Sequence, residues 1–115
     1  MAAVLLCLWV GSENMEIDVH DIEGKTTIAL KGRFDFQTHQ QFHKAVSELL
    51  GNGKARLTVD LSEVNFIDSF ALGVLLVTRE DCAKAGGGVV LERPQEYVNK
   101  VLKLCQFDQL FKIQN

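Results

Sequence analysis

An Asp-Ser pair interrupts the apolar run NFIDSFALGVLL, residues 65–76, where a strand pattern gives way to a helix pattern. Ser69 can be the N-cap of that helix, because a Ser hydroxyl at this position accepts a hydrogen bond from an N–H of the first turn, worth about 1 kcal/mol. Asp68 adds a negative charge near the positive end of the helix dipole. Helix stability alone therefore accounts for both residues.

The Ser69 hydroxyl is also a candidate phosphorylation site. A Ser at a strand-to-helix junction lies where loops leave the sheet and a partner can reach it. Phosphorylation adds about −1.5 to −2 charge and three acceptor oxygens, and the N–H groups of a helix N-terminus tolerate such an anion. A partner docked at this place would meet bulk and negative charge, so phosphorylation can dissociate a complex without unfolding the protein.

Catalysis by the same pair would need further groups that the sequence does not supply. The three histidines, His20, His39 and His43, stand in the first part of the chain, without a G-x-S-x-G motif or other hydrolase context for Ser69. An Asp nucleophile would need an acidic metal site, and neither a P-loop nor a G-x-G-x-x-G sequence occurs. We therefore expect a protein that is not an enzyme and has no cofactor.

A metal site is the other chemistry to consider. His39 and His43 share one face of a predicted helix at i and i+4, a spacing that can bind a metal ion. No carboxylate or third His at a recognisable ligand spacing accompanies them. We expect a solvated helix face there and no metal.

The chain around these residues alternates between strand and helix patterns. Residues 15–22 and 25–34 alternate apolar and polar side chains with the period of a half-buried strand, and Glu23-Gly24 between them predicts an antiparallel hairpin. Residues 55–64 repeat this alternation after a helix, which predicts a βαβ unit with parallel strands. A short buried strand follows at 89–94.

Three segments have the apolar spacing of amphipathic helices. The first has an apolar stripe at Phe42, Ala45, Val46, Leu49 and Leu50. The second is a helix from about Ser69 to Ala85, and the third has an apolar face formed by Val98, Val101, Leu102 and Cys105. The closing segment predicts a last helical turn from Asp108. The order is β-β-α-β-α-β-α, which predicts a single-domain α/β fold with helices packed against a mixed sheet.

The composition fits one soluble domain in a reducing compartment. The chain has 115 residues, of which 47% are hydrophobic and 23% charged, so it has room for one compact domain. Its net charge of −3 comes without a dense Lys/Arg cluster, so direct nucleic-acid binding is not expected. Cys7, Cys82 and Cys105 do not form a disulfide or metal pattern, and we expect small buried thiols in a cytoplasmic protein.

Residues 1–14 stand apart from the domain that we expect over residues 15–115. Ala2 to Val10 is a continuous apolar run of nine residues, which is shorter than the about 20 residues of a membrane-spanning helix, and the segment lacks the basic n-region of a signal peptide. We expect an apolar leader, derived from cloning or from an upstream start, and no membrane span. An extra strand or an interaction segment is the alternative.

The sequence VDLSEVNFIDSFALGVLL, residues 59–76, resembles the signature of the STAS domain of bacterial anti-sigma factor antagonists, in which a strand ending in D-L-S precedes I/M-D-S-x-G/A-L-G-x-L. The matching residues are Asp60, Leu61, Ser62, Ile67, Asp68, Ser69, Ala71, Leu72, Gly73 and Leu75. The segment LKGRFDFQTHQQFHKAV resembles the family's G-x-L/I-D segment, with Gly32 and Asp35 at its most distinctive places. The order of elements over 15–115 agrees with the same family.

The resemblance implies a partner-switching phosphoprotein that acts in signal transduction and transcription regulation. In such systems the unphosphorylated antagonist binds an anti-sigma factor that is itself a Ser/Thr kinase, and so frees the sigma factor. Phosphorylation of the Ser that matches Ser69 releases the antagonist, and a PP2C-type phosphatase restores it. By the same resemblance, Asp35, Asp68, Ser69 and Phe70 lie in the partner-binding surface.

Two alternatives stay open. Phe70 stands where the family more often has a small residue, and its ring either packs into the partner or points inward and makes the Ser less accessible. Phe34 likewise replaces the usual Leu or Ile. In function, the alternative is a STAS domain that is not phosphorylated and serves as a regulatory subunit of a signalling complex or of a lipid-transport ATPase.

Overall fold

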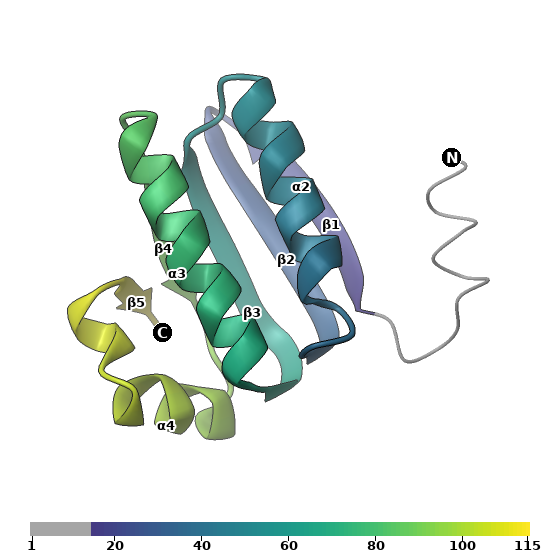
Figure 1. Cartoon of the computed structure of the whole chain (residues 1–115), viewed down its shortest axis with the longest axis vertical. Coiled ribbons are helices and arrows are strands. Elements are labelled where there is room, and N and C mark those ends of the chain that lie inside the picture. The colour runs from purple at the N-terminus through teal and green to yellow at the C-terminus, as the bar shows by residue number, and fades with distance from the viewer. Residues whose placement is uncertain (1–14) are drawn as a thin grey trace.

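The structure is a computed structural model that describes residues 15–115. Its centre is a five-stranded mixed sheet (Figure 1). The sheet has the strand order β1-β2-β3-β4-β5, in which β1 pairs antiparallel with β2 and the other neighbours are parallel. The strands are β1 Glu16–Ile22, β2 Lys25–Phe34, β3 Arg56–Ile67, β4 Gly88–Glu92 and β5 Lys112–Gln114. The predicted α/β fold with a mixed sheet is confirmed.

The hairpin of β1 and β2 turns where the sequence predicts. Glu23 and Gly24 both have positive φ, 53° and 82°, as a two-residue turn matched to the strand twist requires. The apolar side of β1 is less buried than predicted, because Val19 is 42% exposed. The strand lies at the sheet edge, and α2 (His39–Gly51) contacts its beginning, where Gln41 Nε2 donates to the Met15 carbonyl at 2.6 Å.

Two helices cover one face of the sheet side by side, α2 and α3 (Ser69–Lys84) (Figure 1). Each follows one of the parallel strands β2 and β3, so both helices begin at the edge of the sheet where those strands end. Phe42 and Val46 of the predicted α2 stripe are buried, whereas Ala45, Leu49 and Leu50 are half-buried. The core between the helices and the sheet also includes Ala71, Val74, Leu75, Ile28, Val59, Leu61 and Leu91.

The C-terminal part of the chain differs from the prediction at its end. The third helix, α4 (Glu96–Leu104), buries Val98 and Leu102 as expected. The helical turn expected from Asp108 is a 3-10 turn over Phe107–Gln109, and the chain then forms β5 beside β4, which was not predicted. Three residues are too few to show an alternation, so the sequence pattern alone does not distinguish this strand from a loop.

Two of the three cysteines lie within the described residues. Cys82 is buried as predicted, but Cys105 is exposed, because it lies at the C-cap of α4, where the helix leaves the core. Cys7 and the predicted apolar leader 1–14 lie outside the described residues, so the interpretation of that segment stays a prediction. Within residues 15–115, no helix combines the length and apolarity that crossing a membrane would need.

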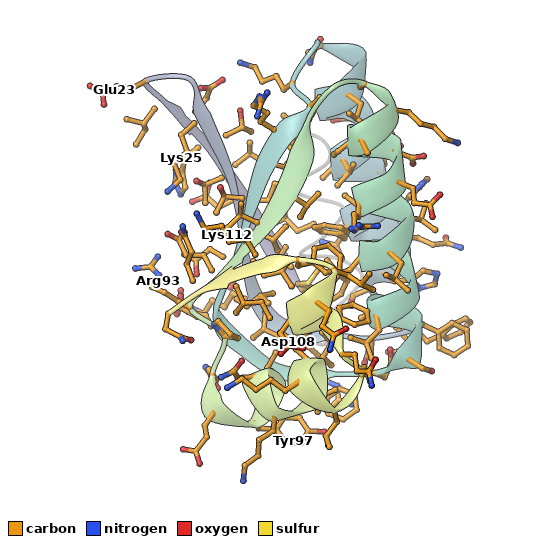
Figure 2. The ribbon with its side chains drawn as sticks, turned by 90° about the vertical axis from the view of Figure 1, so that its left-hand side faces the viewer. Glu23, Lys25, Arg93, Tyr97, Asp108 and Lys112 are labelled. Atoms are coloured by element: carbon orange, nitrogen blue, oxygen red, sulfur yellow. The ribbon has the colours of Figure 1, made fainter. Side chains whose placement is uncertain are left out.

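Ion pairs lie on the second face of the sheet, away from α2 and α3. Figure 2 shows Lys25, Arg93 and Lys112 on the side of the sheet away from α2 and α3. Asp60 is the most buried acid here: its Oδ1 accepts from the Ser62 N–H at 2.9 Å and its Oδ2 from Arg93 Nη2 at 2.6 Å. Burial raises the pKa of Asp60, but the bonds from Ser62 and Arg93 outweigh it and leave this pKa below its usual value.

We expect Asp60→Asn to lower the free energy of unfolding by about 1 kcal/mol at pH 7, a value discounted for the exposed Arg93. Because the folded-state pKa of Asp60 lies below the unfolded one, its contribution is complete above about pH 4 and is lost as pH falls through the folded value. Urea unfolding of both chains from pH 7 to pH 2.5 measures this difference. A difference that grew on acidification would contradict the assignment.

The matched control is Glu92→Gln, which removes the more exposed ion pair with Lys25 on the same face. Exposed pairs contribute little, so we expect a change below about 0.5 kcal/mol at pH 7.

Candidate functional site

The predicted site residues lie together at the edge of the sheet where β2 and β3 end. Asp35 follows β2, and Asp68, Ser69 and Phe70 follow β3. The two loops are joined directly, because the Asp68 N–H donates to the Phe34 carbonyl at 3.3 Å. Parallel strands that run side by side to the same edge therefore bring together two segments that are far apart in the sequence.

Asp68, and not Ser69, is the N-cap of α3. Asp68 has an extended backbone with φ −124° and ψ −176°, and its Oδ1 accepts from the Ala71 N–H at 3.0 Å. Ser69 is already the first helical residue, so its hydroxyl is not the cap. The second oxygen of Asp68 accepts from the Phe36 N–H at 3.0 Å, which ties the start of α3 to the loop between β2 and α2.

Ser69 is exposed at the first position of α3, and its hydroxyl forms no hydrogen bond within the described part of the chain. The helix does not depend on this side chain, because Asp68 supplies the cap. The N-terminal end of a helix also favours a negative group nearby. The position therefore combines a free hydroxyl with the positive end of a helix dipole.

Asp35 points into its own loop more than toward solvent, since its side chain is 13% exposed. Its Oδ1 accepts from the Gln37 N–H at 3.0 Å, and its Oδ2 accepts from Arg33 Nε at 3.2 Å. Thr38 completes the turn: its hydroxyl accepts from the Asp35 N–H at 2.9 Å and donates to the Arg33 carbonyl at 2.8 Å. Asp35 thus shapes the loop that presents Phe36.

An aromatic cluster formed by Phe36, His39 and Phe70 stands beside Ser69. The rings of Phe36 and Phe70 are 4.7 Å apart, and the ring of His39 lies 5.7 Å from the first and 5.9 Å from the second. Phe36 is 59% exposed and Phe70 53% exposed, so Phe70 points outward and does not cover Ser69 from within. Exposed aromatic pairs of this kind are typical of protein interfaces.

Phe36 and His39 are site residues that sequence reasoning missed. Phe36 stands between the polar residues Asp35 and Gln37, two residues after the end of β2 at Phe34. An aromatic side chain in such a loop is a signal for binding, but its proximity to Phe70 depends on the tertiary structure.

A groove runs along α2 and α3 from this cluster. Its volume is about 440 Å³, and its lining includes His39, His43, Ser69, Phe70, Gly73 and Val77. A second hollow of about 480 Å³ lies between α3 and β4, lined in part by Arg79, Val89 and Leu110, and contains none of the predicted site residues.

His39 and His43 lie one helical turn apart on α2. Within residues 15–115, no group of three His, Cys, Asp or Glu side chains is placed to hold a metal ion. Nδ1 of His39 lies 2.6 Å from the Phe36 carbonyl. A carbonyl only accepts, so Nδ1 carries the hydrogen in this bond.

Comparison with known proteins gives one consistent family. The model of the STAS domain family matches residues 16–115. A STAS-domain containing protein of Pseudomonas aeruginosa is 39% identical over 87 residues, which cover 76% of this chain and 85% of that protein. A Thermotoga maritima protein, provisionally named an anti-sigma factor antagonist, is 38% identical over 66 residues, 57% of this chain and 58% of that protein.

Solved structures agree with the family model. An anti-sigma factor antagonist from Mycobacterium paratuberculosis matches with a TM-score of 0.76 at 26% identity, over 90% of this chain and 88% of that one. The anti-sigma factor antagonist SpoIIAA in its unphosphorylated form matches with a TM-score of 0.67 at 18% identity, over 87% of each chain. At that identity the second match shows the shared fold alone.

We expect Asp68→Ala to lower the free energy of unfolding by about 1–2 kcal/mol, because α3 loses its cap. The amide hydrogens of Ala71 and Phe36 should both exchange faster, since each bonds to one oxygen of Asp68. Asp68→Asn keeps one acceptor oxygen and should protect only one of the two amides. Hydrogen exchange followed by NMR measures each amide separately.

The matched control is Asp108→Ala, in the exposed 3-10 turn at the other end of the chain. It should leave both amides protected. If Phe36 and Ala71 kept their protection in Asp68→Ala, the carboxylate would not join the two loops.

Proposed function

This chain belongs to the STAS domain family, and from that membership we propose that it is an anti-sigma factor antagonist that works by partner switching. In its unphosphorylated form it binds an anti-sigma factor that is a Ser/Thr kinase, and the sigma factor is thereby set free. The kinase phosphorylates Ser69, which releases the chain, and a PP2C-type phosphatase restores the binding form. All of these partners act in the cytoplasm.

The observation that carries this proposal is the position of Ser69. Its free, exposed hydroxyl stands at the start of α3 next to two exposed aromatic rings, so one surface can both dock a partner and receive a phosphate. In the transfer, the Ser69 oxygen forms a bond to the γ-phosphorus of ATP, ADP leaves, and the hydroxyl proton goes to the kinase base. Hydrolysis by the phosphatase returns the hydroxyl and inorganic phosphate.

The phosphate would act on the interface and not on the fold. Before modification, Phe36 and Phe70 offer apolar area to the partner. A phosphate of about −2 charge beside them must be desolvated or displaced when the partner docks, and the neighbouring Asp68 adds to the repulsion of any acidic group. The chain is a substrate and a binder in this cycle and not a catalyst.

We expect the cognate kinase with ATP to add one phosphate, on Ser69, as mapped by mass spectrometry. Ser69→Ala should stay bound to the kinase, and Ser69→Asp should weaken binding at least about tenfold. Calorimetry with the purified kinase measures both affinities. Phosphate found only at other positions, or none at all, would favour the unphosphorylated regulatory subunit as the function of this chain.

Phe36→Ala should weaken binding of the same kinase about tenfold or more, because truncating a central interface aromatic removes buried apolar contact. Its ring is 59% exposed in the free chain, so the free energy of unfolding should change by less than about 0.5 kcal/mol. The matched control is Tyr97→Ala on α4, where the ring is 52% exposed away from the groove. Equal losses from both variants would place the interface elsewhere.

A further inference from the structure

Two histidines on α2 line the groove that begins at Ser69. His39 and His43 are one helical turn apart, and both line the hollow of about 440 Å³ that Ser69 also lines. We propose that His39 and His43 form an internal receptor for the phosphate of phosphorylated Ser69, an inference that rests on the proposed phosphorylation of this residue. The phosphate is then held within the groove between α2 and α3.

The arrangement of the helices puts the two groups within reach of one another. Helices α2 and α3 start at the same edge and run side by side in the same direction (Figure 1), so the first turn of α3 lies level with the first turns of α2. Gly73, one turn after Ser69, lines the groove, and a Cβ added there would meet no heavy atom within 4 Å. The groove therefore has room for a phosphate above Gly73.

His39 is oriented for this contact by its surroundings. Its Nδ1 donates to the Phe36 carbonyl at 2.6 Å, and its ring lies between 5.7 and 5.9 Å from the rings of Phe36 and Phe70. With Nδ1 committed to the carbonyl, Nε2 is the nitrogen that gains a proton when the ring becomes charged, and it can then donate to a phosphate oxygen. His43 is exposed and its ring has no hydrogen-bond partner within the described residues.

Apart from Asp68, which adjoins Ser69, the charges around the groove favour an anion. Among residues 15–115, no carboxylate lines the groove. Asp35 and Asp68, the acids in the loops before α2 and α3, have their oxygens engaged by Arg33 and by backbone N–H groups. On α2 the next charged residue beside His43 is Lys44, and on α3 the first is Arg79. The N-terminal ends of both helices add their partial positive charge at this same edge.

With the phosphate bound to the two histidines, phosphorylation blocks one end of the groove to a docking partner. A phosphate held by α2 occupies the end of the groove nearest the aromatic cluster, so a partner side chain can no longer enter there. A dianionic phosphate and a protonated imidazole ring attract one another, so the contact is strongest where these two forms coexist.

The test uses the full chain with phosphoserine installed at position 69 during translation, which needs no kinase. We expect the ³¹P NMR titration of this phosphate to have its midpoint lower by about 0.5 pH unit or more than in the double variant His39→Gln/His43→Gln, because protonated rings stabilise the dianion. The ring signals of His39 and His43 should shift on phosphorylation, while those of His20 on β1 should not. The matched control is His20→Gln, which should leave the ³¹P midpoint unchanged.

The proposal is wrong if the ³¹P midpoint is the same with and without the two histidines and the ring signals of His39 and His43 move no more than those of His20. Partner release by phosphorylation would then still stand, since it is measured with the kinase and not with the installed phosphoserine. Conversely, a kinase that leaves Ser69 unmodified would remove the proposed function even if the installed phosphate binds both rings. Amide NMR spectra of each variant check that it is folded before its titration is compared.

Discussion

Both oxygens of the Asp68 carboxylate are hydrogen bonded to backbone N–H groups, one from Ala71 in α3 and one from Phe36 in the loop before α2. The first bond starts the helix that carries Ser69. The second fixes the loop that carries Phe36, and so brings its ring to 4.7 Å from Phe70. The half-buried carboxylate of Asp68 thus positions the hydroxyl, the aromatic cluster and the mouth of the groove together.

The sheet topology brings the two loops close enough for the Asp68 carboxylate to join them. Strands β2 and β3 are parallel and paired through to their ends, where Phe34 lies opposite Ile67. Both of these residues are buried, at 0% and 3% exposure, so apolar packing fixes how far each strand runs before its loop begins. The loops after the two strands then meet at one edge, which is the place where parallel α/β sheets bind ligands and partners.

The sequence was sufficient where a local pattern decides the structure. The 3.6-residue spacing of Phe42 and Val46 predicts α2, and Glu23-Gly24 predicts the hairpin. Local patterns were not sufficient to choose the N-cap of α3, because Asp68 and Ser69 are both good N-cap residues. Asp68 also accepts a hydrogen bond from the Phe36 N–H, which is 32 residues away in the sequence. The strand β5, the exposure of Cys105 and the aromatic cluster likewise depend on contacts between distant segments.

The division of roles between Asp68 and Ser69 has a consequence for how a switch can work at a helix start. If Ser69 were the cap, a phosphate on its oxygen would alter the hydrogen bond that begins α3, and modification would carry a cost in stability. Because Asp68 caps the helix, the Ser69 oxygen can change its charge while the cap, the loop and the buried face of α3 stay as they are. Under the proposed phosphorylation, the surface would change its charge and its shape at constant fold, and the free energy of phosphorylation would act on the equilibrium between partners.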